Sequence, residues 1–233
     1  MLLAAPLTDS CAGPLSTGSH VCIGVSPFNS YFSVDRIAAI ARWAQRSFDA
    51  FHFFVPDGAS VHTLEALGYP PNRARYKAGR QGQYVINKIH RALDEVGVAD
   101  PTGYVLSSAA LDGDPAYLAL LDRVHAEFDD NPAFAHECLE ASRWVLDRRL
   151  PDGEEPTPDQ LAIAVRYFLA ELPMFLDTVS IAKVESSVFA YHQRVHFLEL
   201  LYRQELSLTP HPRQGFVVLS HDEASTPDGG TFA

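Results

Sequence analysis

The chain has 233 residues, 47% of them hydrophobic, which is typical of one globular domain with a sizeable core. No apolar run approaches the roughly 20 residues of a membrane span, and the first residues lack the regions of a signal peptide. Three widely spaced cysteines, Cys11, Cys22 and Cys138, indicate neither a disulfide framework nor a zinc site. We therefore expect a cytoplasmic protein without membrane contact.

Charge is distributed unevenly along the chain. A net charge of −11 counts against a nucleic-acid partner. Residues 66–93, however, contain no Asp or Glu and hold one third of the 18 basic residues, namely Arg73, Arg75, Lys77, Arg80, Lys88 and Arg91. Such a segment either binds a phosphate backbone or forms a solvated helix face, and composition alone leaves both open.

The first part of the chain predicts an arm, a strand and a helix. Residues 1–19 are rich in Ala, Pro, Ser, Thr and Gly and predict a loose arm before a domain over 20–222. The apolar run 21–25 predicts a buried strand that stops at Pro27, because proline has no N–H for the ladder. A helix with Ser33 as its N-cap is expected next.

The remaining elements alternate between strands and helices. Strands are expected at 51–55, 104–107, 187–191 and 215–219. Helices are expected at 60–67, 81–96, 115–128 and 132–150. A further helix is expected to begin at Pro158 and to end or bend at Pro173. The basic segment is expected to enter its helix through a loop, and residues 223–233 to form a disordered tail. This alternation predicts an α/β fold with a mainly parallel sheet covered by helices on both faces.

Three polar groups fall at positions suited to chemistry. Ser26 stands at the carboxyl end of the first strand, where α/β proteins place ligands, although a polar turn that caps the next helix explains it equally well. Tyr167 and Glu171 are four residues apart on an otherwise apolar helix, where a hydrogen bond at the helix edge is the simpler interpretation. Tyr191 and His192 end a predicted strand and could equally be a strand end that meets water.

Familiar catalytic motifs do not account for these residues. Residues 24–28 lack the second glycine of a G-x-S-x-G nucleophile elbow. The chain has no G-x-G-x-x-G fingerprint and no P-loop, so neither a dinucleotide nor ATP is expected. The histidines have no metal-binding spacing, and we expect neither a metal nor another cofactor.

Three segments together resemble the cyclodipeptide synthase family. The run Gly24–Ser33 (GVSPFNSYFS) is similar to the family's serine loop, with Ser26 at the nucleophile position. Tyr167–Pro173 is similar to its Tyr…Ala-Glu-x-Pro segment, and Ser186–His192 to its second tyrosine segment. They occur in the family's order, and Asn29, Tyr191 and His192 resemble the markers of the subgroup named for Asn, Tyr and His.

The resemblance implies a fold and a reaction. The fold is a Rossmann-like domain similar to the catalytic domain of class I tyrosyl- and tryptophanyl-tRNA synthetases. The reaction joins the amino acids of two aminoacyl-tRNAs into a cyclic dipeptide, with no ATP or DNA, in a monomer. Ser26 would form an aminoacyl-enzyme, Tyr167 and Glu171 would hold the ammonium group, with Glu171 also taking a proton, and Tyr191 would orient Ser26 or relay protons.

The resemblance also implies binding residues. It places the substrate around seven positions: Cys22, Gly24, Asn29, Phe54, Met174, Phe189 and His192. The apolar members predict a hydrophobic first amino acid, and the two phenylalanines favour a small aliphatic one. The basic residues would grip the tRNA acceptor arm, but Asn87-Lys88 replaces an arginine cluster common in relatives, so the grip is weaker or shifted. A serine hydrolase or acyltransferase on small esters, and a non-catalytic tRNA-binding domain, stay open.

Overall fold

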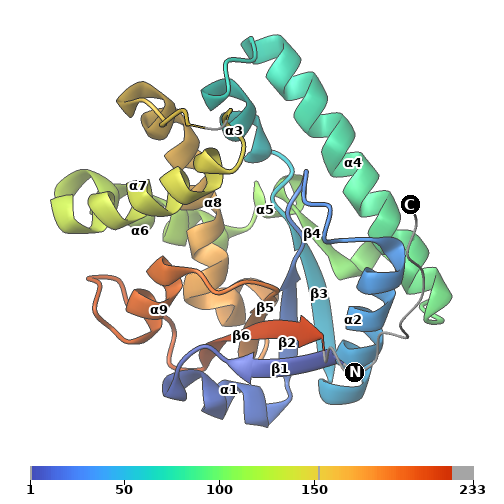
Figure 1. Ribbon diagram of the computed structural model, residues 1–233. Helices are drawn as coiled ribbons and strands as arrows, with labels where there is room; N and C mark the ends of the chain where they lie inside the picture. Colours follow the sequence, from blue (N-terminus) through green and yellow to red (C-terminus); the bar gives the residue numbers. More distant parts are fainter. Residues whose placement is uncertain (1, 152, 222–233) are drawn as a thin grey trace, which may run out of the picture.

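The computed structural model describes residues 2–151 and 153–221, which contain a six-stranded sheet with helices on both faces (Figure 1). The strand order is β1-β6-β5-β2-β3-β4, and all neighbours are parallel except β1 and β6. This confirms the predicted mainly parallel sheet. The strands are β1 (Leu2–Pro6), β2 (His20–Gly24), β3 (Ala50–Val55), β4 (Val105–Ser107), β5 (Ser187–Tyr191) and β6 (Gln214–His221).

The helices form two layers. One layer contains α2 (Val34–Ser47) and α4 (Pro71–Glu95), whose apolar residues pack with Val21, Ile23 and Phe53 of the sheet. The other contains α8 (Pro158–Ala182), which packs with Cys22, Phe189 and other residues of the opposite face. Around α8 lie α6 (Pro115–Asp130), α7 (Pro132–Asp147) and α9 (His196–Tyr202), as Figure 1 shows. The short helices are α1 (Ala12–Thr17), α3 (Ser60–Ala66) and α5 (Ser108–Leu111).

Local sequence signals account for the ends of several elements. Every residue of β2 is buried, as expected for a central strand covered on both faces. The Ser33 hydroxyl accepts a hydrogen bond from the Arg36 N–H at 3.2 Å and so caps α2, as predicted. At the start of α8, Thr157 and Gln160 form a reciprocal capping box. Capping therefore fixes where the helices that flank the central strands begin.

The expected loose arm over residues 1–19 is wrong for most of that segment. Residues 2–6 form β1, which pairs antiparallel with β6, and α1 follows. Cys11, just before α1, is fully buried. Composition misled the prediction because an edge strand is stabilised by main-chain hydrogen bonds to a partner about 200 residues away, and its own side chains carry little of the signal.

The six basic residues of this segment all lie on α4, which corrects the expected loop before residue 81. α4 begins at Pro71, a residue suited to the first helical position because its missing N–H has no helical partner. Gly82 lies inside the helix where a Cβ would come within 2.5 Å of the Asp57 Cβ, so the glycine permits close packing against the loop after β3. One continuous helix therefore fixes the positions of all six basic residues relative to one another.

Two further expectations have different outcomes. α8 does not end at Pro173; it continues to Ala182, and its backbone leaves helical geometry at Asp177. The expected tail at 223–233 lies outside the described residues. Within 2–151 and 153–221, no helix is both long enough and apolar enough to cross a membrane.

Candidate active site

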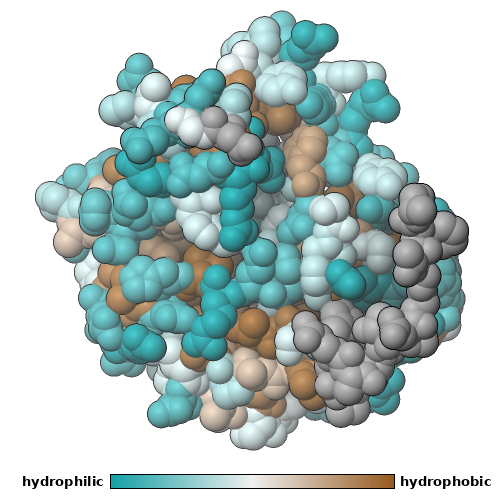
Figure 2. Space-filling view, in the orientation of Figure 1, coloured by the Kyte–Doolittle hydropathy of each residue, from teal (hydrophilic) through white to brown (hydrophobic). Residues whose placement is uncertain are grey.

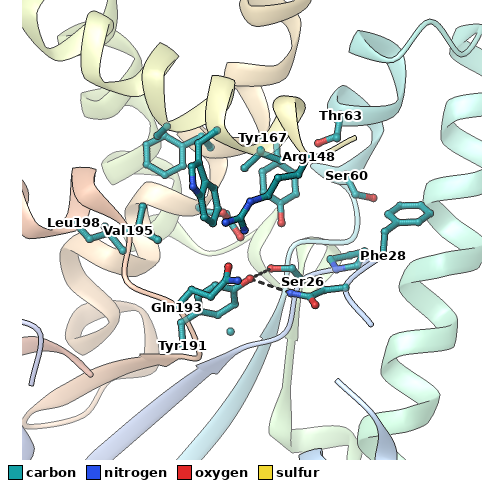
Figure 3. Close-up of a pocket in the computed structure, with 18 of the residues that line it drawn as sticks. Ser26, Phe28, Ser60, Thr63, Arg148, Tyr167, Tyr191, Gln193, Val195 and Leu198 are labelled. Carbon is teal, nitrogen blue, oxygen red and sulfur yellow. Dashed lines mark hydrogen bonds between the residues drawn. The ribbon is translucent and has the colours of Figure 1, made fainter. Parts of the chain in front are cut away.

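A cavity of about 360 Å³ opens at the carboxyl ends of β2 and β5 (Figure 3). From β2 the chain proceeds to β3 on one side of the sheet, and from β5 it proceeds to β6 on the other. This reversal of strand order leaves a crevice between the connections, which is where open α/β sheets bind ligands. Ser26, Tyr167, Glu171 and Tyr191, which come from three separate segments, all line it.

Ser26 is positioned by the main chain on both sides of it. The Val25 N–H donates to the Phe54 carbonyl at 2.9 Å, which extends the β2–β3 ladder by one residue. Pro27 then ends the ladder, and Phe28 adopts a left-handed backbone with φ of 62°. The chain turns sharply there, and the half-buried Ser26 side chain faces the cavity.

Tyr191 and Asn29 hold the Ser26 hydroxyl in a hydrogen-bond network. Ser26 Oγ lies 3.1 Å from the Tyr191 hydroxyl, and Asn29 Nδ2 donates to the same hydroxyl at 3.3 Å (Figure 3). The Asn29 side-chain oxygen accepts from the Tyr31 N–H at 3.0 Å, which fixes the orientation of the amide. The serine loop and the end of β5 are therefore joined directly.

His192 supports this network from behind the cavity. Its ring stacks on Tyr31 with centroids 3.8 Å apart, and its Nε2 lies 3.5 Å from Asn29 Nδ2. Burial, with the nearby Arg36 guanidinium, lowers the pKa of His192 to about 4. The ring is therefore neutral at pH 7 and can accept a hydrogen bond from Asn29.

Tyr167 and Glu171 face the cavity from α8, one turn apart. Desolvation raises the pKa of Glu171 to about 8, and its hydrogen bond with Tyr167 only partly opposes this shift. Desolvation, with Glu171 nearby, also raises the pKa of Tyr167 well above its ordinary value. At pH 7 the carboxyl group is therefore mostly neutral, and a bound ammonium would favour its ionised form.

The seven residues expected to bind the substrate divide into two groups. Gly24, Asn29 and Phe189 line the cavity. Cys22, Phe54 and Met174 are buried in the core, and neither they nor His192 line it. The apolar end of the cavity is formed instead by Phe175, Leu198 and Phe216.

Sequence reasoning missed these apolar residues and a charged rim. Phe175 follows Glu171 by one helical turn, so helical spacing from Tyr167 was a usable signal. Trp144, Arg148 and Arg149, at the end of α7 and just beyond it, also line the cavity, and the Arg148 Cζ lies 3.8 Å from the Trp144 ring centroid. No local pattern marked this segment.

The basic residues of α4 fall into three groups. Arg73, Lys77 and Arg80 line a second hollow beside the helix, with Phe28, Tyr69, Tyr76, Gln81 and Tyr84. Arg75 and Arg91 are exposed outside it. Lys88 is partly buried and its Nζ donates to the Phe32 carbonyl at 3.0 Å, which ties α4 to the end of the serine loop. In Figure 2 the uncovered surface over the upper part of α4 is mostly teal to white, which marks hydrophilic residues and residues of intermediate hydropathy.

Two named proteins are similar to this chain over most of its length. A cyclo(L-leucyl-L-leucyl) synthase of Bacillus subtilis is 33% identical over 221 residues, which cover 93% of this chain and 88% of that protein. A cyclo(L-tyrosyl-L-tyrosyl) synthase of Mycobacterium tuberculosis is 31% identical and covers 97% of this chain and 76% of that protein. Both names describe synthases of cyclic dipeptides.

Solved structures share the fold. A cyclodipeptide synthase of Bacillus thermoamylovorans superposes with a TM-score of 0.88 at 26% identity, over 95% of this chain and 97% of that one. A Mycobacterium tuberculosis protein superposes with a TM-score of 0.83 at 31% identity, over 95% and 94% of the two chains, and its structure is described as relating these enzymes to type I tRNA synthetases. At 14% identity, a synthase of Candidatus Glomeribacter gigasporarum, solved bound to Phe-tRNAPhe, shares the fold with a TM-score of 0.54 over 92% and 90% of the chains.

The family model for cyclodipeptide synthases matches residues 2–221, which include the cavity and every element of the sheet. Together with the relatives above, this confirms the resemblance carried by the three sequence segments. The chain belongs to the cyclodipeptide synthase family, whose members are enzymes that form peptide bonds.

Proposed function

We propose that this enzyme makes a cyclic dipeptide from two aminoacyl-tRNAs in a ping-pong reaction through an aminoacyl ester on Ser26. The observation that carries the proposal is the hydroxyl of Ser26, 3.1 Å from the Tyr191 hydroxyl, in the same cavity as Tyr167 and Glu171. The tRNA-bound relative described above and the basic face of α4 support tRNA as the carrier.

In the first half-reaction, Ser26 Oγ attacks the ester carbonyl carbon of the first aminoacyl-tRNA. The bond to the ribose oxygen breaks, and the proton of the serine hydroxyl is transferred to that oxygen. The Tyr191 hydroxyl lies close enough to Ser26 to orient it and to relay the proton. No ATP is needed, because the aminoacyl ester is already activated.

The bound amino group is held by α8. An ammonium beside Glu171 favours the ionised carboxylate, although desolvation otherwise keeps this group mostly neutral at pH 7. The resulting ion pair, with the Tyr167 hydroxyl beside it, orients the aminoacyl group against Phe175 and Phe189 at the apolar end of the cavity. We propose a hydrophobic first amino acid, in keeping with relatives named for leucine and tyrosine.

In the second half-reaction, the amine of the second aminoacyl-tRNA attacks the seryl ester. The peptide bond forms, the ester bond to Ser26 breaks, and the serine hydroxyl is restored. Glu171, once ionised, accepts the proton that the attacking amine loses and passes it to the departing Ser26 oxygen. The ammonium of the first residue then gives a proton to Glu171, and the resulting amine attacks the remaining tRNA ester. The ring closes, the bond to the ribose oxygen breaks, and that oxygen leaves with the tRNA and takes up the proton that the amine nitrogen loses.

Mass spectrometry of the culture medium tests the proposal. Bacteria that express the wild type should accumulate a diketopiperazine, and the Ser26→Ala variant should accumulate none. Ser47→Ala, which changes an exposed serine at the end of α2, serves as the matched control and should keep the product. Incubation with charged tRNA should add one aminoacyl mass, located on residue 26.

Two outcomes would overturn the proposal. A non-catalytic domain predicts that Ser26→Ala leaves the biological activity intact. An esterase or acyltransferase of small molecules predicts activity on free esters that survives digestion of all RNA with ribonuclease, whereas an enzyme that uses aminoacyl-tRNA loses its substrate.

A further inference from the structure

Arg36 lies at a helix position that disfavours a positive charge. Ser33 caps α2, which begins at Val34, so Arg36 is the third residue of the first helical turn. The helix dipole favours acidic side chains in this turn and opposes cations, and a capping box has Glu or Gln at this position. The stability of α2 therefore does not account for an arginine here, and its side chain indicates another role.

The half-buried Arg36 side chain lies against the end of the serine loop. Its Cζ lies 4.3 Å from the centroid of the Tyr31 ring, and its Nη1 donates to the Tyr31 carbonyl at 3.4 Å. Tyr31 stacks on the His192 ring, with the centroids 3.8 Å apart and the planes inclined by only 16°. One aromatic ring therefore contacts both the guanidinium of α2 and the imidazole that follows β5.

The hydrogen bonds of Asn29 require a neutral His192. Asn29 Oδ1 accepts from the Tyr31 N–H at 3.0 Å, which fixes the amide. Asn29 Nδ2 then faces the Tyr191 hydroxyl at 3.3 Å and His192 Nε2 at 3.5 Å. This nitrogen accepts a hydrogen bond only when it carries no proton. No described residue accepts from His192 Nδ1, so a protonated ring would have an acceptor at neither nitrogen.

The positive charge of Arg36 disfavours a second positive charge at His192. Burial first, and then the Arg36 guanidinium, lower the pKa of His192 to about 4. Tyr31 alone would favour the protonated ring, because an aromatic face attracts a cation. Arg36 already supplies a cation to the Tyr31 ring, so a charge on the imidazole is repelled.

Other ionisable groups surround His192 on each side. Burial raises the pKa of Tyr31 and of Tyr191, which both pack against the imidazole, so neither phenol carries a negative charge at pH 7. On α4, the Lys88 ammonium donates to a carbonyl of the serine loop and adds a further positive charge. In the segment of His192 itself, Arg194 is paired with a carboxylate of α9 at 2.7 Å. Arg36 is the group whose charge acts on the imidazole through the shared ring.

We propose that Arg36 is a positioning residue of the reaction, an inference that rests on the proposed attack by Ser26. Arg36 keeps His192 an acceptor for the Asn29 amide. That amide donates to the Tyr191 hydroxyl, which lies 3.1 Å from Ser26 Oγ. Arg36 does not line the cavity, so it acts on the nucleophile without touching the substrate.

NMR titration of the histidine rings tests the charge effect without any assay of activity. The wild-type His192 ring should stay neutral down to about pH 5, one unit above its pKa of about 4. In Arg36→Gln the midpoint should lie about one pH unit higher. Arg36→Lys keeps the charge and should titrate like the wild type. Arg42→Gln, which removes an exposed arginine from the same helix, is the matched control and should leave the midpoint unchanged.

Kinetics of product formation test the positioning role. For Arg36→Gln, kcat at pH 7 should fall about threefold or more while KM is unchanged, because the group removed does not touch the substrate. The acid limb of the pH–rate profile should also begin about one pH unit higher than in the wild type. Arg36→Lys should keep the acid limb of the wild type and recover most of kcat, and Arg42→Gln should match the wild type in both.

Further outcomes separate the inference from a folding defect and from the proposed function. Circular dichroism should show Arg36→Gln melting at or above the temperature of the wild type, because glutamine suits this helix position. An unshifted His192 titration in Arg36→Gln, an equal shift in Arg42→Gln, or a raised KM with unchanged kcat overturns the inference. Absence of an aminoacyl ester on Ser26 of the wild type overturns the proposed function instead.

Discussion

Replacing Gly24 with alanine tests how tightly the floor of the cavity is packed. A Cβ at this position would lie 2.8 Å from both Cε1 and Cζ of Phe189, and 3.4 Å from Cδ2 of Tyr191. Ordinary contact begins at 3.4 Å, so the Phe189 ring would have to retreat by 3.4 − 2.8, or about 0.6 Å.

The Phe189 ring has little room to retreat. It stacks on Phe216 with centroids 5.8 Å apart, and Phe175 meets it edge-on at 4.7 Å. Overpacking of such a cluster typically costs about 1–3 kcal/mol. Because alanine in place of glycine otherwise stabilises a compatible backbone by about 0.4–1 kcal/mol through the unfolded state, a net loss of stability can be attributed to the clash.

Urea unfolding of a double-mutant cycle measures this effect. Gly24→Ala should lower the free energy of unfolding by about 1–3 kcal/mol, and Phe189→Leu by about 1–2 kcal/mol through the cavity it leaves. The double variant should be more stable than the sum of the two losses by about 1 kcal/mol or more, since the shorter leucine makes room for the new methyl group. Additive losses, or a Gly24→Ala variant as stable as the wild type, would refute the reasoning.

Four further substitutions, the last two of them a matched pair, test separate parts of the structure. Glu171→Gln should abolish product formation yet raise the free energy of unfolding at pH 8 by about 2–4 kcal/mol. The folded pKa of Glu171, about 8, lies above the model-peptide value of 4.5, so the wild type loses stability as the pH rises through this interval and the glutamine variant does not. An unchanged urea midpoint would contradict this. Burial and the neighbouring His52 lower the pKa of His20 from 6.5 to about 3, so the stabilisation of the fold by its neutral ring is complete above pH 6.5. The free energy of unfolding of the wild type should therefore fall by about 2 kcal/mol by pH 5. His20→Leu should not show this loss when unfolding is measured at several pH values. For tRNA binding, Arg80→Gln should reduce the salt slope by about one unit while Lys88→Met leaves it unchanged, because Lys88 is held by a main-chain carbonyl; equal slopes for both variants argue against the assigned roles.

Much of the site was predictable because its parts are local. The strand that ends at Pro27, the capped helix with Tyr167 and the strand that ends at Tyr191 each have a signal within a few residues. Backbone stereochemistry, capping and hydrophobic periodicity act over that same distance. For the same reason, the amino-acid order alone indicated the family, and the three segments that carry the resemblance line one cavity in the structure.

Contacts between distant segments were not predictable from those signals. Ser26 and Tyr191 meet at 3.1 Å because β2 and β5 are adjacent in the sheet, although 165 positions separate them in the chain. Equally, Met174 lies in the core and the next residue, Phe175, lines the cavity, which depends on how α8 is rotated against the sheet. Side-chain packing sets that rotation, and no short segment encodes it.

The α/β fold class, the succession of most elements and the residue types at the sheet edge could thus be inferred from the amino-acid order. The packing of the whole chain added β1 to the sheet, made α4 one continuous helix and placed Phe28 in the lining of both the cavity and the hollow beside α4. This division follows from the range of the forces involved. Helix and strand preferences arise within a few residues, whereas strand partners, cavities and grooves form only when segments far apart in the chain pack together.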